Sequence, residues 1–361
     1  MHRFLFVLLI SIIACQDVPV SPAPAIEQWT MVPFEKADSI NPILTPDAAA
    51  RFTCPILNKE IQWERKDVFN PATVVRNDTL FLLYRAEDTI GKFAGTSRIG
   101  LAWSLDGWHF TKSGKPVLYP DNDSLKSLEW EGGCEDPRVV EDSSGRYIMT
   151  YTSYDGKTAR LMTAYSMDLY HWFKTGTAFS DPWRNVWSKS GSIVCREVNG
   201  KMIAQRINGK YVMYYGDTNI FLAESDDLLH WQPVLNEKQE PLAVFGPRKG
   251  KFDSDLVEPG PPAMITNHGI LLLYNSRNVP SKGDSSLAEG TYAASQILLD
   301  STHPEKVLNR MDTWFLKPEK DYEILGQVNH VCFIEGLAHY KNSWFLYYGT
   351  ADSRIAVAVK K

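Results

Sequence analysis

The 361-residue chain has few cysteines, no run of basic residues and no long apolar segment. Its five cysteines show no Cys-x-x-Cys spacing, so the sequence indicates neither a zinc site nor a thiol redox motif. In an oxidising compartment Cys54, Cys134, Cys195 and Cys332 could form disulfides, but their apolar neighbours equally suit free, buried thiols. The net charge is −5 and no basic cluster is present, so we expect no nucleic-acid partner.

The apolar run Phe4–Ala14 is too short to span a bilayer. It follows a positive N-terminus and ends at Cys15 in a pattern that resembles a bacterial lipobox. We therefore expect a lipoprotein signal peptide at 1–14, lipidation of Cys15 and a flexible linker over 15–25. The protein would then be anchored in the periplasm or on the cell surface of a Gram-negative bacterium, touching the membrane only through its lipid. Plain secretion is the alternative.

A hydrophobic strand built around a tyrosine recurs five times along the chain. The marker residues are Tyr84, Tyr151, Tyr214, Tyr274 and Tyr347, at intervals of 67, 63, 60 and 73 residues. A repeat of this size is typical of one blade of a β-propeller. With 44% hydrophobic residues, the chain can bury a large core.

A second strand follows each tyrosine strand, as in Ser97–Ser104 and Ala159–Ser166. Three of these second strands, which end at Ser104, Ser166 and Ser225, lead into a Ser-x-Asp turn before an aromatic residue. The sequence therefore predicts an all-β fold, a single five-bladed β-propeller over 26–361. An ordinary antiparallel sandwich is the alternative.

In a propeller the innermost strand of each blade lines the central channel, so polar residues at its start can converge on one ligand. The strand before each tyrosine strand is the candidate, and four of the five candidates carry a carboxylate. They open with Asn70-Pro71, Glu135-Asp136-Pro137-Arg138, Ser190-Gly191 leading to Glu197, Glu258-Pro259 and Glu335-Gly336. Their neighbours are mostly apolar, which indicates a functional ring of acids.

More polar residues follow the tyrosine strands, among them Arg85, Asp88, Asp155, Asp217 and Asp352. Each could serve an Asx turn or an ion pair between blades. Acids that face one another in a funnel also suit glycosidic cleavage, in which one carboxyl protonates the leaving oxygen and another activates water. Such a funnel could instead hold a cation. The many aromatic residues can stack on sugar rings. We expect a sugar substrate and neither a cofactor nor a catalytic metal.

Six motifs stand in order between about Asp67 and Val359. They are Phe69-Asn70-Pro71-Ala72, Tyr84-Arg85-Ala86-Glu87-Asp88, Ser97-Arg98-Ile99-Gly100, Gly133-Cys134-Glu135-Asp136-Pro137-Arg138, Asn208-Gly209-Lys210-Tyr211 and Gly260-Pro261-Pro262. This set resembles glycoside hydrolase family 130, the β-mannoside phosphorylases and β-mannosidases on a five-bladed propeller.

The resemblance implies exo-action at a non-reducing mannosyl end by an inverting mechanism. It makes Asp136 the acid, acting through a hydroxyl of the bound mannose as in the phosphorylases. It also places Asn70, Arg85, Asp88, Arg98, Arg138 and Asp352 on the mannosyl ring. To these we add Glu335, from the ring of acids, as a substrate-binding residue.

Two departures from the family pattern bear on the reaction. Phosphorylases typically place a His-Arg pair that helps to bind phosphate where this chain has Tyr215-Gly216, followed by Asp217. They also tend to have a lysine and small glycines before Gly-Pro-Pro, where this chain has Glu258. A carboxylate at a phosphate site repels phosphate and suits the deprotonation of water.

The sequence therefore favours an inverting exo-β-mannosidase that acts on β-mannoside glycans, with β-1,2 linkages as the expected target. Asp136 is the predicted acid, Glu258 the leading base and Glu197 the second candidate for the base. The alternatives are a β-mannosyl phosphorylase that forms mannose 1-phosphate, and a non-catalytic glycan-binding surface lipoprotein. A five-bladed arabinan or fructan hydrolase is disfavoured because its motifs do not match.

Overall fold

The computed structural model describes residues 28–93, 95–279 and 281–361. β-Strands dominate this part of the chain, and its two helices, α1 (Lys126–Glu129) and α2 (Asp321–Ile324), have four residues each. The predicted all-β class is confirmed. The predicted signal peptide, Cys15 and the linker lie outside the described residues. No helix within the described ranges is long and apolar enough to cross a membrane.

Each predicted tyrosine strand is the central strand of an antiparallel group, and we name the groups after these strands. The β5 group has β4 (Asp67–Arg76), β5 (Thr79–Glu87), β6 (Ser97–Ser104) and β7 (Thr111–Lys112). The β9 group has β8 (Gly133–Glu141), β9 (Tyr147–Tyr154), β10 (Ala159–Ser166) and β11 (Trp172–Thr177). The β16 group has β12 (Ser192–Ile193), β15 (Arg206–Ile207), β16 (Lys210–Tyr215), β17 (Ile220–Ser225), β18 (Trp231–Pro233) and β19 (Ala243–Phe245).

The remaining groups complete the fold. The β22 group has β20 (Leu256–Pro259), β21 (Met264–Thr266), β22 (Gly269–Arg277), β23 (Tyr292–Leu299) and β24 (Val307–Arg310). The β26 group has β25 (Cys332–Tyr340), β26 (Ser343–Thr350), β27 (Arg354–Lys360) and β1 (Glu35–Lys36). Two hairpins stand apart from this scheme, β2 (Phe52–Cys54) with β3 (Lys59–Ile61) and β13 (Cys195–Val198) with β14 (Lys201–Ala204).

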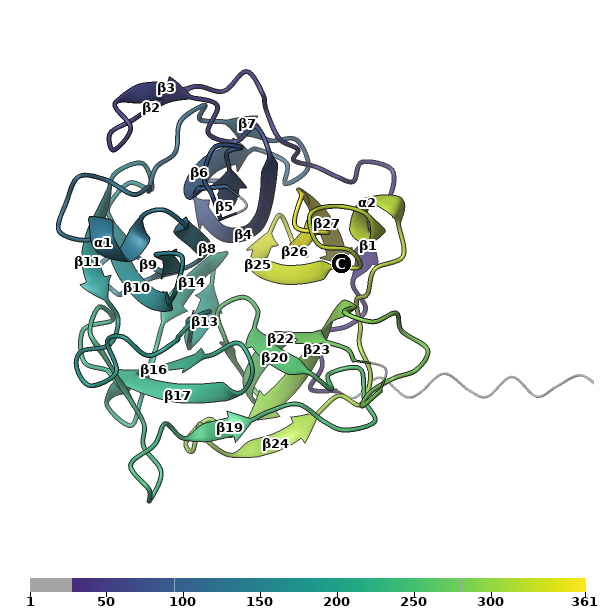
Figure 1. The fold of residues 1–361 in the computed structure, drawn as a ribbon. Coiled ribbons are helices and arrows are strands. Elements are labelled where there is room, and N and C mark those ends of the chain that lie inside the picture. The colour runs from purple at the N-terminus through teal and green to yellow at the C-terminus, as the bar shows by residue number, and fades with distance from the viewer. Residues whose placement is uncertain (1–27, 94, 280) are drawn as a thin grey trace, which may run out of the picture.

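The groups are arranged around the middle of the molecule (Figure 1). Strands β4, β8, β13 and β25 lie nearest to the middle, and β7, β11 and β24 lie toward the outside. The first strand, β1, pairs with the last, β27, so segments from both ends of the described chain share one sheet. The starts of the inner strands, where the sequence placed its ring of acids, are thus brought together.

Four of the five groups are held together by a buried ionic cluster. In each cluster a carboxylate that precedes the inner strand accepts a hydrogen bond from a tyrosine hydroxyl on the central strand and pairs with a cation on the outermost strand. The clusters are Glu64–Tyr84–Lys112, Glu129–Tyr151–Lys174, Asp253–Tyr274–Arg310 and Glu323–Tyr348–Lys36. These partners offset the cost of burying each acid. In the last repeat the equivalent tyrosine is Tyr348, one residue after the predicted marker.

The predicted Ser-x-Asp turns are present. Asp106, Asp168 and Asp227 each accept two backbone N–H bonds and pair with a histidine three residues on. The four cysteines of the described chain are buried and free, so of the two interpretations left open by the sequence, the structure supports free thiols.

Candidate active site

A cavity of about 120 Å³ lies where the inner strands begin. Its wall combines acids, cations and apolar side chains: Asn70, Arg85, Asp136, Lys189, Glu258, Tyr292, Val328, Val331, Phe333 and Asp352. Five of the predicted site residues are thus brought together: Asn70, Arg85, Asp136, Glu258 and Asp352.

β-Bulges aim these side chains. The registers of β4 with β5, β8 with β9 and β25 with β26 shift at Asn70, at Asp136 and at Glu335. Asn70 and Asp136 both have a φ of 47°, in the left-handed region that asparagine and aspartate tolerate best among residues with a Cβ. Such bulges redirect a side chain out of the regular alternation of a strand and are common beside active sites. The Asn-Pro and Asp-Pro motifs therefore mark the positions where the strands turn a polar group into the cavity.

Asp136 is held by three neighbours. Its Oδ1 accepts a hydrogen bond from Asn70 Nδ2 at 2.9 Å and lies 3.2 Å from Arg85 Nη1, and its Oδ2 lies 3.8 Å from Lys189 Nζ. Burial raises the pKa of Asp136, but the charges of Arg85 and Lys189 and the Asn70 hydrogen bond outweigh it and lower the pKa to about 2. Asp136 is therefore ionised near neutral pH.

Arg85 contacts two further acids close to Asp136. Its Nη2 lies 2.7 Å from Glu87 Oε1 and 3.1 Å from Glu135 Oε1. Burial raises the pKa of Glu135 to about 7, and it raises the pKa of Asp352, which is also close to Arg85 and Asp136, to about 7. Interacting carboxyl groups titrate as a unit, so Asp136, Glu135 and Asp352 share their protons, and part of this titration lies near neutral pH.

Glu258 faces Asp136 across Lys189. Its Oε1 accepts a hydrogen bond from Ser190 Oγ, and burial raises its pKa although Lys189 opposes the shift. Lys189 itself has a pKa raised by Glu258, Asp136 and Glu135, against the effect of burial, so it stays charged. A base needs a pKa near the working pH, and burial moves Glu258 in that direction.

Arg138 and Glu335 lie behind the cavity wall and do not line it. Arg138 donates to the carbonyl oxygens of Pro259 and Gly260 at 2.6 and 2.7 Å, and thus ties β8 to the segment that follows Glu258. Glu335 lies 3.6 Å from Arg138, and neither of its buried oxygens has a hydrogen-bond partner among the described residues. Burial raises the pKa of Glu335 well above its usual value, although the charge of Arg138 opposes the shift.

Asp88 and Arg98 also lie outside the cavity wall. They form a buried ion pair of 2.8 Å in which both side chains are 1% exposed. Asp88 Oδ1 also accepts N–H bonds from Ile90, Gly91 and Thr96. The pair therefore positions the loop between β5 and β6, whereas the sequence had assigned both residues to substrate binding.

Glu197 lies away from the cavity, which makes it a poor candidate for the base. It stands on β13, where it accepts a bond from Gly200 N–H and pairs with His339 at 3.2 Å. Seven residues of extended chain separate it from Ser190, roughly 23 Å at 3.3 Å per residue. The sequence argument took Ser190 and Glu197 as one strand opening, but the chain continues through β12 before it reaches Glu197.

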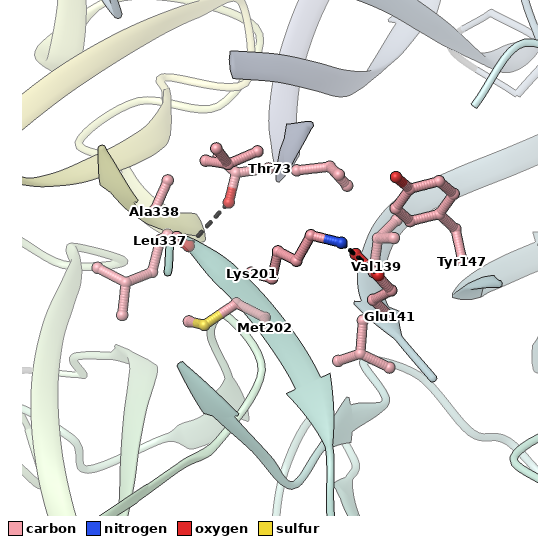
Figure 2. A pocket seen from close by; sticks show the side chains of 12 residues that line it. Thr73, Val139, Glu141, Tyr147, Lys201, Met202, Leu337 and Ala338 are labelled. Carbon is pink, nitrogen blue, oxygen red and sulfur yellow. Dashed lines mark hydrogen bonds and ion pairs between the residues drawn. The ribbon is translucent and has the colours of Figure 1, made fainter. Parts of the chain in front are cut away.

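Figure 2 shows the far ends of the inner strands, next to this β13–β14 hairpin. Lys201 Nζ pairs with Glu141 Oε1 at 2.7 Å, and Thr73 Oγ1 donates to Leu337 O at 2.8 Å. The space left there is only about 10 Å³, against about 120 Å³ at the Asp136 end.

Several cavity residues escaped the sequence argument. Lys189 lies immediately before the third strand opening and belongs to no motif. Phe333 lies on β25, two residues before Glu335. Tyr292, at the start of β23, belongs to none of the motifs. The rings of Tyr292 and Phe333 lie 6.3 Å apart and give the cavity an apolar side. Tyr215, taken as a replacement in the phosphate site, instead packs against Phe179 and Phe221 outside this cavity.

A small, acid-lined cavity with an apolar side, on a rigid all-β scaffold, is typical of enzymes that act on glycosidic bonds. The family model of glycoside hydrolase family 130, described as β-1,4-mannooligosaccharide phosphorylase, matches residues 37–361. The chain belongs to this family. No group of three or more His, Cys, Asp or Glu side chains in the described ranges is arranged to hold a metal ion.

Individual relatives carry two kinds of activity. A 1,2-β-oligomannan phosphorylase of Thermoanaerobacter sp. (strain X514) is 32% identical over 333 residues, or 89% of this chain and 95% of the relative. A glycosyl hydrolase from Bacteroides ovatus is 44% identical, with a TM-score of 0.91 over 93% of this chain and 96% of that one.

A further solved structure is 42% identical, with a TM-score of 0.91 and coverage of 93% and 96%. It comes from work stating that the GH130 family of mannoside phosphorylases contains glycoside hydrolases that target β-1,2 mannosidic linkages in Candida mannan.

Proposed function

We propose that this protein is an inverting exo-β-mannosidase that releases mannose from β-mannosides, with β-1,2 linkages as the substrate. The observation that carries the proposal is that both cations of the cavity, Arg85 and Lys189, already face carboxylates. Three acids, Asp136, Glu258 and Asp352, share the same wall. A phosphate dianion would find no unpaired positive charge there.

The proposal also takes the five strand groups as the blades of a five-bladed β-propeller, with the cavity at one end of its axis. The cavity is smaller than the roughly 300–1,000 Å³ of most ligand sites, which suits a single sugar ring and hence exo-action. Tyr292 and Phe333 supply an apolar surface for the C–H face of that ring.

In this mechanism Glu258 deprotonates water, which attacks the anomeric carbon, and the glycosidic oxygen leaves with a proton. Asp136 supplies that proton through a hydroxyl of the bound mannose. Asp136 has a low pKa, so it must first gain a proton, and we assign its source to Glu135 and Asp352, with pKa values of about 7. The charge of Lys189 acts on both Asp136 and Glu258 and stabilises their ionised forms.

A β-mannosyl phosphorylase is the second candidate, because the characterised relative named above is a phosphorylase. The hydrolase is favoured by the higher identity to the glycosyl hydrolase from Bacteroides ovatus, 44% against 32% for that phosphorylase. A non-catalytic glycan-binding protein has no use for a buried pair such as Asp136 and Glu258.

Mannose release from β-1,2-mannobiose is expected to proceed at the same rate with and without phosphate, because Glu258 activates water and no free cation awaits an anion. The products are identified by NMR, with equal concentrations of sulfate as the matched anion control. Formation of mannose 1-phosphate, with a rate that rises with phosphate but not with sulfate, would show a phosphorylase. The absence of any turnover would favour the glycan-binding protein.

We also propose that the protein is a lipoprotein anchored through Cys15, outside the cytoplasm. The protein produced with its full N-terminus is expected to partition into the detergent phase of a Triton X-114 separation, and Cys15→Ala into the aqueous phase, because the thioether that carries the lipid is lost. Equal partitioning of the two proteins would contradict the anchor. Cys54→Ala serves as the control for loss of a thiol.

A further inference from the structure

The β16 group lacks the ionic cluster that the other four groups share. Its central-strand tyrosine Tyr214 donates to the backbone oxygen of Pro304, and its neighbour Tyr215 packs between Phe179 and Phe221, with ring centroids 4.8 and 5.6 Å away. In the described chain, no acid preceding β12 pairs with a cation on the outer strands of this group.

A cleft of about 570 Å³ occupies the equivalent place. Its walls come from the same three kinds of element that build the ionic clusters elsewhere: the segment before the inner strand, the central strand and the outermost strands. We name it the aromatic cleft, and its lining includes Trp183, Trp187, Ser188, Tyr215, Phe221 and Ala243.

The aromatic cleft has the composition of a sugar-binding site. It offers broad aromatic faces, and Trp187 is 49% exposed. Ser188, Asn236 and Glu240 add hydrogen-bonding groups. No Lys, Arg or His is among its lining residues in the described ranges, which disfavours an anionic ligand. Its volume lies within the range of about 300–1,000 Å³ that small-molecule sites occupy.

The aromatic cleft adjoins the catalytic cavity through one short segment. Ser188 lines the cleft, and the next residue, Lys189, lines the cavity. Trp187 and Lys189 are two residues apart, which is at most about 7 Å of backbone. Trp187 Nε1 also donates to Asp217 Oδ2 at 2.7 Å, and the charge of Asp217 acts on both Lys189 and Glu258.

We propose that the aromatic cleft binds mannosyl units on the aglycone side of a longer β-mannoside whose terminal unit occupies the catalytic cavity. This proposal rests on the proposed function, since it takes the ligand to be a mannoside. A chain that leaves the cavity past Lys189 passes Trp187 and enters the cleft, where Trp183 and Tyr215 offer aromatic surface. The enzyme would therefore prefer oligomannosides to mannobiose.

Titration calorimetry with β-1,2-mannobiose, mannotriose and mannotetraose tests whether the aromatic cleft binds the additional mannosyl units. The full-length Glu258→Gln variant is used so that the ligands survive. Affinity is expected to rise about 3- to 10-fold from mannobiose to mannotetraose, the gain typical of one or two aromatic contacts. Two variants should abolish the gain: Trp183→Ala, which removes a stacking surface, and Ala243→Trp, which fills the cleft from an exposed strand position without removing a buried side chain.

Phe173→Ala is the matched control, because Phe173 is an exposed aromatic on β11 that does not line the cleft, and it should keep the gain. Equal affinities for all three ligands, or a gain that persists in both cleft variants, would overturn the proposal. If the gain persists while Ala243→Trp alters the sedimentation of the protein, the cleft is a contact between copies of the chain. Turnover of an aryl β-mannoside by the wild type tests the proposed function separately, because oligosaccharide binding does not depend on the reaction type.

Discussion

Replacing Glu258 by glutamine is expected to lower mannoside turnover by about 10²–10⁴-fold, because the variant keeps the shape of the side chain but cannot take a proton from water. The protein should remain folded and should still bind mannoside. Glu197→Gln is the matched control, since Glu197 contacts Gly200 and His339 far from the cavity, and it should retain wild-type turnover.

Azide gives the sharper test of the two roles. With an aryl β-mannoside, whose leaving group needs little acid assistance, azide should rescue Glu258→Gln and form the α-mannosyl azide, the inverted product. When Asp136→Asn is assayed with a substrate that has a poor leaving group, azide should not increase the formation of mannosyl azide. Azide can replace the activated water, but it cannot replace the proton donor. If Glu258→Gln keeps near-wild-type turnover while Glu197→Gln is inactive, the base is Glu197. If both variants stay active, the two-carboxylate mechanism fails.

Replacing Arg98 by methionine is expected to destabilise the protein by about 3–5 kcal/mol, because it leaves the Asp88 carboxylate buried without its cation. Urea unfolding followed by tryptophan fluorescence measures the change. The loop that Asp88 holds through Ile90, Gly91 and Thr96 should also become accessible to protease.

Arg146→Met is the control for loss of an arginine. Its partner Asp142 also accepts hydrogen bonds from Ser144 and from the Arg146 backbone, so its carboxylate keeps other partners and the loss should be smaller than for Arg98→Met. If Arg98→Met leaves the unfolding free energy unchanged but raises the KM for mannoside, Arg98 contacts the substrate directly, as the family resemblance implies.

Much of the architecture follows from local sequence pattern. The strands Ser97–Ser104 and Ala159–Ser166 have the bounds predicted from their position after the tyrosine strands and before the Ser-x-Asp turns. Asn70-Pro71 and Asp136-Pro137 also act locally, because a left-handed residue followed by proline interrupts strand pairing at that point. The convergence of Asn70, Asp136 and Glu258 on one cavity could therefore be predicted from the repeat.

Other positions depend on contacts between residues far apart in the chain. Glu64, Glu129, Asp253 and Glu323 stand in irregular segments or single helical turns, where no periodicity marks them, and only their tyrosine and cation partners make them buried structural acids. The sequence predicted that Asp88 and Arg98 contact the sugar because no local pattern shows that the two residues pair with each other. A motif shows which residues stand together, but not whether the pair faces the cavity or the loop behind it.

The sequence by itself determined the all-β class, the five tyrosine strands and the identity of the polar groups at the strand openings, because these depend on the repeat of hydrophobic strands, on turn signals and on residues with special backbone preferences. The tertiary structure decided which of those groups share a cavity. It placed Glu197 on β13, away from the cavity, brought Lys189 into the same cavity as Asp136 and Glu258, and left the aromatic cleft where an ionic cluster is missing. Each of these outcomes depends on how strands from different repeats pack side by side, and that spacing is set by long-range contacts that no local pattern records.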